Sequence, residues 1–172
     1  MATASPLISL EEYLRTSYHP DADYVDGEVE ERNLGEYEHA RLQAVLAGIF
    51  LRQERDWNVR VLTEQRIFID TNRVRICDVC LISRDAPREA VLKHPPLLCV
   101  EILSPEDRLS RAQLVLQDYL NIGVMNIWLL DPLRQSAYTF DGKGLHIFDG
   151  ELLAVPGTDI RLNLTEAFAA ID

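Results

Sequence analysis

Hydrophobic and polar residues follow a pattern that predicts a single α/β domain. Between residues 36 and 55 the apolar positions recur at helical spacing, so this segment predicts a long helix with one face in the core. Further helices are expected at 9–16, 105–121 and 164–171, and strands at 58–63, 66–70, 74–82, 97–103 and 124–130. This order, with antiparallel strands before a strand–helix–strand unit, favours a mixed sheet with helices on its faces.

Local signals define both ends of the predicted domain. Ser9 and Glu12 form a capping box for the first helix, and Asp26-Gly27 predicts a hairpin turn within residues 23–32. Residues 136–155 have the turn spacing of an additional antiparallel β-meander. No repeat or linker interrupts the 172 residues, so one domain spanning residues 1–172 is expected.

Two predicted core strands each contain one acidic residue. Asp78 lies within the apolar segment 76–82, and Glu101 lies within 98–103. A buried carboxylate is costly unless it is paired or bound to a cation, and two on successive strands can share one ion. Mg²⁺ prefers such oxygen ligands. The alternative is that both acids are structural and satisfied by Arg60, Arg75 or backbone donors.

The strand containing Glu101 runs through Ser104-Pro105 directly into a predicted helix. The N-terminus of that helix should therefore lie near Glu101. Helix N-termini favour anions, so a phosphate group is a natural ligand at this position.

Five stretches of the chain resemble the Uma family of endonucleases, a branch of the PD-(D/E)XK superfamily. They are DYVDGEVE (23–30), EHARLQAVL (38–46), RICDVCLISRD (75–85), PPLLCVEILSPEDR (95–108) and DYLNIGVMNIWLLDP (118–132). The resemblance implies a restriction-endonuclease-like fold and cleavage of nucleic acid, with DNA favoured. It further implies Mg²⁺ or Mn²⁺ as cofactor, with Asp78 and Glu101 as its ligands. Glu28 and His39 match positions that recur in the family, where a supporting and a purely structural role are both open.

The catalytic lysine that the resemblance implies is absent. The superfamily position is Leu103 and the Uma position is Val115, and the two lysines, Lys93 and Lys143, lie outside these motifs. Arg111 lies one helical turn before Val115 on the same flank and is expected to supply positive charge to a phosphate. It cannot act as a base, because a guanidinium stays protonated.

Two alternatives concern that helix. Gln113 lies on its opposite flank and is a weaker candidate than Arg111. Arg111 itself also fits the description of a solvated surface arginine. The incomplete site leaves two hypotheses, an atypical metal-dependent endonuclease and a decayed nuclease fold that acts as a binding or scaffolding homodimer.

Charge and composition narrow the functional classes. The net charge is −11, which disfavours a basic module that simply coats nucleic acid. No apolar run approaches the roughly 20 residues of a membrane-spanning helix, and no signal peptide opens the chain, so a cytoplasmic protein is expected. A homodimer would suit double-strand cleavage by a small domain with one site.

The three cysteines invite a comparison with zinc sites. Cys77 and Cys80 have CxxC spacing, and Cys99 lies on the next strand. Residues three apart in a regular strand point to opposite faces, so Cys77 and Cys80 are not expected to share a metal. Small buried thiols filling core space are the expected role.

Overall fold

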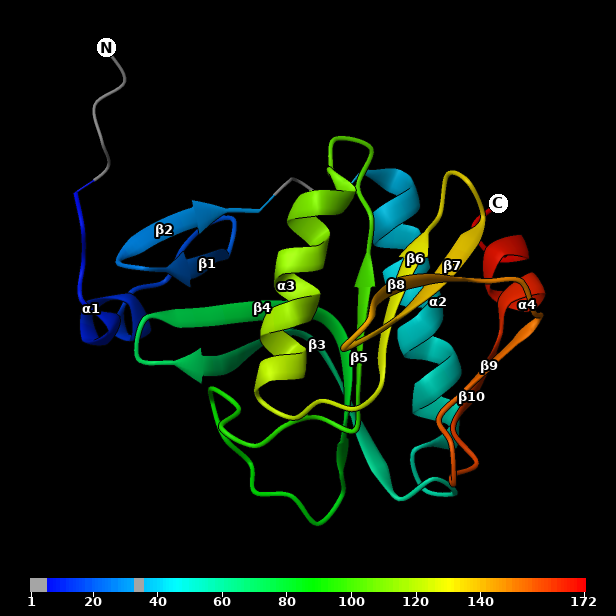
Figure 1. Ribbon diagram of the computed structural model, residues 1–172. Helices are drawn as coiled ribbons and strands as arrows, with labels where there is room; N and C mark the ends of the chain where they lie inside the picture. Colours follow the sequence, from blue (N-terminus) through cyan, green and yellow to red (C-terminus); the bar gives the residue numbers. More distant parts are fainter. Residues whose placement is uncertain (1–5, 33–35) are drawn as a thin grey trace.

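The computed structural model describes residues 6–32 and 36–172, which form a mixed α/β fold (Figure 1). Its helices are α1 (Leu10–Arg15), α2 (Tyr37–Gln53), α3 (Leu109–Asn121) and α4 (Leu164–Ala169). Its first strands are β1 (Ala22–Val25), β2 (Glu28–Glu31), β3 (Val59–Asp70), β4 (Arg73–Ser83) and β5 (Leu98–Ile102). The later strands are β6 (Ile127–Asp131), β7 (Ser136–Asp141), β8 (Gly144–Phe148), β9 (Leu152–Ala154) and β10 (Arg161–Asn163).

Eight strands form the main sheet in the order β2-β1-β4-β5-β6-β7-β8, with β3 also paired to β4. Only β5 and β6 among these are parallel, and α3 connects them. The expected mixed sheet with flanking helices is therefore confirmed. Within the described residues, no helix is long and apolar enough to span a membrane.

Strand β4 pairs with three strands, β1, β3 and β5, although a strand has only two edges. β3 pairs along almost its whole length, so β1 and β5 must share the opposite edge. On this edge of β4, β1 pairs only with Arg73 and Val74, and the pairing with β5 starts at Val79. In the part of the chain that the structure describes, no strand pairs with this edge between Val74 and Val79. A gap therefore opens there in the sheet.

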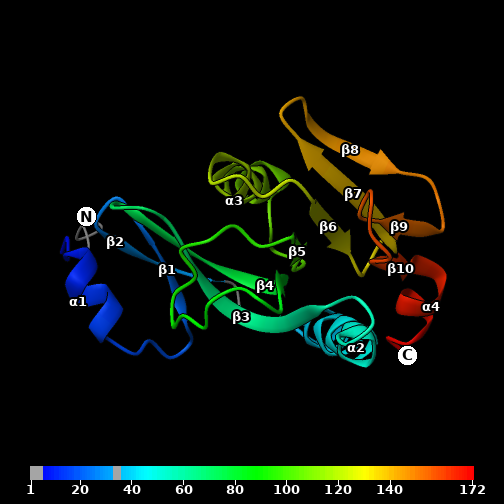
Figure 2. The same ribbon diagram turned by 90° about the horizontal axis from the view of Figure 1, so that it is seen from below.

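The helices cover the two faces of the sheet (Figure 2). α2 packs on one face, where Leu42, Leu46 and Phe50 are fully buried. α3 packs on the other face through Leu116 and Tyr119. Burial of each such side chain stabilises the fold by about 1.5–3 kcal/mol, and the two layers together fix α2 and α3 on either side of the gap.

Two local predictions at the N-terminus are confirmed. The Ser9 side chain accepts a hydrogen bond of 3.1 Å from the amide of Glu12, as a helix N-cap should. Asp26 and Gly27 have φ values of 52° and 90°, the left-handed pair that a type I′ hairpin turn requires.

Several element boundaries were predicted wrongly, among them the start of β6, which is Ile127 rather than 124. α3 begins at Leu109 rather than 105, because a turn closed by Ser104 and Asp107 precedes it. Segments 58–63 and 66–70 form one strand, β3, which is irregular where Glu64 has a φ of 50°. In 136–155, β7 and β8 do form an antiparallel pair that extends the main sheet, but β9 leaves it and pairs with β10.

The prediction that Cys77 and Cys80 face opposite sides of the sheet was also wrong. Both thiols, with Cys99, belong to the buried cluster under α3. The strand pair departs from a regular pleat here, since Glu64, with its positive φ, lies between the residues paired with Cys77 and Val79. The Cys77 thiol donates to the backbone oxygen of Val79 at 3.3 Å, so the expected role as small buried side chains is consistent with its surroundings.

Candidate active site

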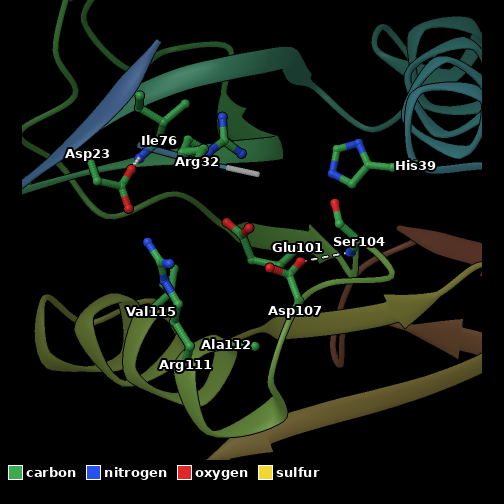
Figure 3. A pocket seen from close by; sticks show the side chains of 10 residues that line it. All are labelled: Asp23, Arg32, His39, Ile76, Glu101, Ser104, Asp107, Arg111, Ala112 and Val115. Carbon is green, nitrogen blue, oxygen red and sulfur yellow. Dashed lines mark hydrogen bonds between the residues drawn. The ribbon is translucent and has the colours of Figure 1, made fainter. Parts of the chain in front are cut away.

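A small cavity opens beside the gap on the edge of β4 (Figure 3). Its volume is about 80 Å³, which is enough to admit several water molecules. α3 forms one wall and the start of α2 forms the opposite one. The lining residues are Asp23, Arg32, His39, Ile76, Glu101, Ser104, Asp107, Arg111, Ala112 and Val115.

The register of the sheet brings the two predicted acids together. Val79 pairs with Val100, and extending this antiparallel register by one residue sets Asp78 opposite Glu101. Like charges at facing positions of neighbouring strands repel each other. The charge of Asp78 therefore acts on Glu101, although nothing but their position in apolar strands marked the two acids in the sequence.

Asp78 lies just beneath the cavity and is 1% exposed. Its Oδ2 accepts the amide hydrogen of Ile102 at 2.8 Å and lies 3.3 Å from His39 Nε2, while Oδ1 accepts from Arg32. Burial works to raise the pKa of Asp78, but the hydrogen bond from His39 and the charge of Arg32 outweigh it. The net pKa is lowered, so the side chain is a carboxylate.

Glu101 lines the cavity wall itself. The buried hydroxyl of Tyr119 on α3 donates a 2.6 Å hydrogen bond to its Oε1. Burial and the negative charge of Asp78 raise the pKa of Glu101 well above its usual value. A positive charge between the two acids would relieve this repulsion.

Arg32, which the sequence did not single out for the site, carries the positive charge that reaches Asp78. Its guanidinium bonds both Asp78 and Glu64, and its side chain is 20% exposed. Gln43 completes this arrangement by donating to Glu64 Oε1 at 2.6 Å and to the backbone oxygen of Asp78 at 2.9 Å. Arg60 and Arg75, the partners first considered for Asp78, bond other groups.

The two residues suggested as supporting the site fall in different places. His39, in the first turn of α2, is buried and contacts Asp78. Burial opposes its protonation, but the hydrogen bond to Asp78 and the negative charge of Asp78 together outweigh it, and the pKa of His39 is raised. Glu28 starts β2, pairs with Val25 and is exposed, outside the set of lining residues. The structure thus places His39 beside the cavity and Glu28 in the hairpin.

Arg111 and Val115 both line the cavity, as their shared flank of the helix predicted. Arg111 is 51% exposed and lies at the rim. Its Nη2 is 3.3 Å from the backbone oxygen of Glu31 and 3.6 Å from Glu30 Oε2. This guanidinium is therefore tethered loosely to the hairpin and stays open to solvent.

A buried ionic network holds the hairpin, β4 and α3 around the cavity. Arg75 Nη1 bonds Asp23 at 3.0 Å, and its Nε bonds Asp118 at 2.7 Å. Asp23 also accepts the amide hydrogen of Ile76 at 3.0 Å. That amide lies in the gap of β4, where a neighbouring strand would otherwise accept it.

Comparisons with known proteins identify the family and the fold of the chain. A family model named Uma2, described as "Putative restriction endonuclease", matches residues 10–152. This chain belongs to the Uma2 family. A crystal structure from Anabaena variabilis ATCC 29413, described as "a putative nuclease belonging to DUF820", has a TM-score of 0.84 and 20% identity, covering 96% of this chain and 99% of that one. No curated protein sequence matches the chain.

The donor set of this Uma2 chain fits a small hard cation. Across residues 6–32 and 36–172, no group of three or more histidine, cysteine or acidic side chains is placed to hold a metal. Two facing carboxylates remain, which is the number of protein ligands that Mg²⁺ often uses alongside water and a substrate phosphate. The cysteine cluster offers no zinc site among these residues.

Proposed function

We propose that this Uma2 protein is a metal-dependent endonuclease that hydrolyses phosphodiester bonds of nucleic acid. Asp78 and Glu101 would hold Mg²⁺ or Mn²⁺. The observation that supports the proposal is the register of β4 and β5, which, extended by one residue, brings Asp78 opposite Glu101 on the cavity wall. Like charges at facing positions repel each other, and a bound divalent cation would neutralise both acids.

The surrounding residues prepare this pair for the reaction. His39 and the amide of Ile102 keep Asp78 ionised and fixed in direction. Tyr119 orients Glu101 through its 2.6 Å hydrogen bond. A bound Mg²⁺ supplies a water of lowered pKa and neutralises charge on the phosphate. Arg111, at the rim, is placed to contact a phosphate oxygen of the substrate.

The cavity suits a phosphate group rather than a whole nucleotide. Its small volume of about 80 Å³ favours entry of a phosphate while the sugar and base stay outside. The charges that line it are close to balanced, with Asp23, Glu101 and Asp107 facing Arg32, Arg111 and His39. A substrate anion therefore meets less repulsion here than the net charge of −11 suggests. DNA is the substrate we favour.

Cleavage assays test the proposal directly. Supercoiled plasmid and single-stranded DNA are incubated with the wild-type protein and with Glu101→Gln purified identically, in Mg²⁺ and in Mn²⁺. Arg15→Gln serves as a control far from the cavity, since Arg15 is exposed on α1. Cutting that requires metal and is lost only in Glu101→Gln supports the proposal. Equal cutting by the wild type and Glu101→Gln identifies a contaminant and contradicts it.

The alternative is a decayed nuclease fold that serves as a binding or scaffolding homodimer. Val115 at the family's lysine position favours it, as does the engagement of Asp78 by a protein cation. The alternative predicts no cleavage and no divalent-cation binding by calorimetry. It also predicts a stable dimer by sedimentation.

A further inference from the structure

Arg32 separates Asp78 from the cavity. Glu101 and Arg32 both line the cavity (Figure 3), whereas Asp78 is 1% exposed and is not among the lining residues. Asp78 Oδ2 already accepts from Ile102 and contacts His39, so Oδ1 is the oxygen with room for a further ligand. Arg32 binds that oxygen. A cation in the cavity would therefore compete with the guanidinium for Asp78 Oδ1.

A guanidinium and a divalent ion cannot both neutralise the same carboxylate oxygen without repelling each other. Arg32 is held in the metal-free protein by Asp78 and Glu64, and the charge of Glu101 also favours its protonated form. A metal between Asp78 and Glu101 would take over that neutralisation. Arg32 would then lose its buried partner and keep the half-exposed Glu64.

Glu64 is held in a position where it can keep the Arg32 guanidinium after Asp78 releases it. Its backbone has a φ of 50°, a left-handed conformation that is uncommon for a residue with a side chain. Gln43 anchors its Oε1 at 2.6 Å, which leaves Oε2 to bond Arg32. Glu64 can thus hold the guanidinium by one edge while the other edge turns away from Asp78.

We propose that Arg32 exchanges partners, neutralising Asp78 before a divalent cation binds and contacting the substrate phosphodiester afterwards. The proposal rests on the proposed function of Asp78 and Glu101 as cation ligands. Arginine suits the second role because its planar fork of donors matches two phosphate oxygens. Arg32 also lines the cavity from the inner side, whereas Arg111 is half-exposed at the rim.

The exchange links cation binding to nucleic-acid binding through one residue. Competition at Asp78 should weaken binding of the cation alone, and release of Arg32 should strengthen binding of a phosphodiester once the cation is present. Replacing Arg32 by a neutral side chain must then change the two affinities in opposite directions. A residue with only a structural role would lower both.

Two binding measurements test this without requiring turnover. Mn²⁺ is titrated calorimetrically into the wild type, Arg32→Gln, Arg32→Lys and Arg15→Gln, and a fluorescent oligonucleotide duplex is titrated in Ca²⁺ at constant salt. Circular dichroism melts verify folding of each variant. Arg32→Gln should bind Mn²⁺ roughly tenfold more tightly and the duplex roughly tenfold more weakly, with Arg32→Lys between it and the wild type. Arg15→Gln removes the same charge and should match the wild type.

Each contrary result has a distinct meaning. If folded Arg32→Gln binds Mn²⁺ no more tightly than the wild type, Arg32 does not compete with the cation. If Arg32→Gln binds Mn²⁺ more tightly but the duplex with unchanged affinity, the exchange is overturned, because Arg32 would then only block the cation. Mn²⁺ binding that Glu101→Gln abolishes would leave the proposed function standing in both cases. Absence of Mn²⁺ binding in the wild type and in Arg32→Gln alike would instead refute the cation site itself, and the exchange with it.

Discussion

Replacing Arg75 by methionine tests how the ionic network supports the site. The Arg75 side chain is 6% exposed and bonds Asp118 at 2.7 Å and Asp23 at 3.0 Å. Its removal leaves both carboxylates buried without that partner, and breaking a buried ion pair in this way costs about 3–5 kcal/mol. Asp118 keeps Arg73 as a partner at 2.9 Å, and Asp23 keeps the amide of Ile76. We therefore expect the free energy of unfolding to fall by about 3 kcal/mol.

The pH dependence of that loss identifies its cause. Burial already raises the pKa of Asp23, and the charge of Arg75 opposes the rise. Without Arg75 the pKa of Asp23 should rise further, and a raised pKa in the folded state removes stability as pH increases. The deficit of Arg75→Met should therefore be smaller at pH 5 than at pH 7.

Urea unfolding of the wild type and Arg75→Met at both pH values measures these differences, with Arg15→Met as the surface control. In a chain of this size the expected loss corresponds to a fall in Tm of about 6–12 °C. A deficit below about 1 kcal/mol would refute the reasoning, because it would mean that the network adds little to stability. A deficit that is equal at pH 5 and pH 7 would refute the assignment to Asp23.

Two further predictions follow from buried tyrosine hydroxyls. Tyr119→Phe keeps the ring but removes the 2.6 Å hydrogen bond to Glu101, so Mg²⁺-dependent cleavage should slow roughly tenfold. An unaltered cleavage rate would count against this orienting role of Tyr119. Tyr13 donates to the backbone oxygen of Ala22 at 2.7 Å, and burial raises its pKa above the usual 10. Its contribution to stability should fall by about 1.4 kcal/mol per pH unit above pH 10. Urea unfolding at pH 9 and 11 should show a smaller fall in the free energy of unfolding for Tyr13→Phe than for the wild type. An identical fall in both proteins would contradict this.

The features that the sequence predicted are those with a local or periodic cause. The turn at Asp26-Gly27 needs only two residues that tolerate positive φ, and the α2 stripe needs only helical spacing. Asp78 and Glu101 were found because each interrupts an apolar strand. Their direct opposition depends on the register of β4 and β5, which only the folded sheet reveals.

What the sequence did not predict comes from contacts between distant segments. Arg32 lies 46 positions before Asp78 in an acidic stretch, where its charge suggests an ordinary surface residue. Tyr119 lies in the buried cluster under α3, and a place in an apolar pattern says nothing about where its hydroxyl points. The error over Cys77 and Cys80 has a different cause, since the positive φ of Glu64 distorts the strand pair without a glycine to signal it.

The central claim is that Asp78 and Glu101 together hold the cation that makes this Uma2 protein cut phosphodiester bonds. Single-turnover cleavage of an end-labelled duplex in Mg²⁺ tests it most directly, with the wild type and Glu101→Gln compared at equal concentration. The account predicts cleavage that EDTA abolishes and that is at least about 100-fold slower in Glu101→Gln. Cleavage that proceeds at the same rate in both proteins, or that persists in EDTA, would contradict it.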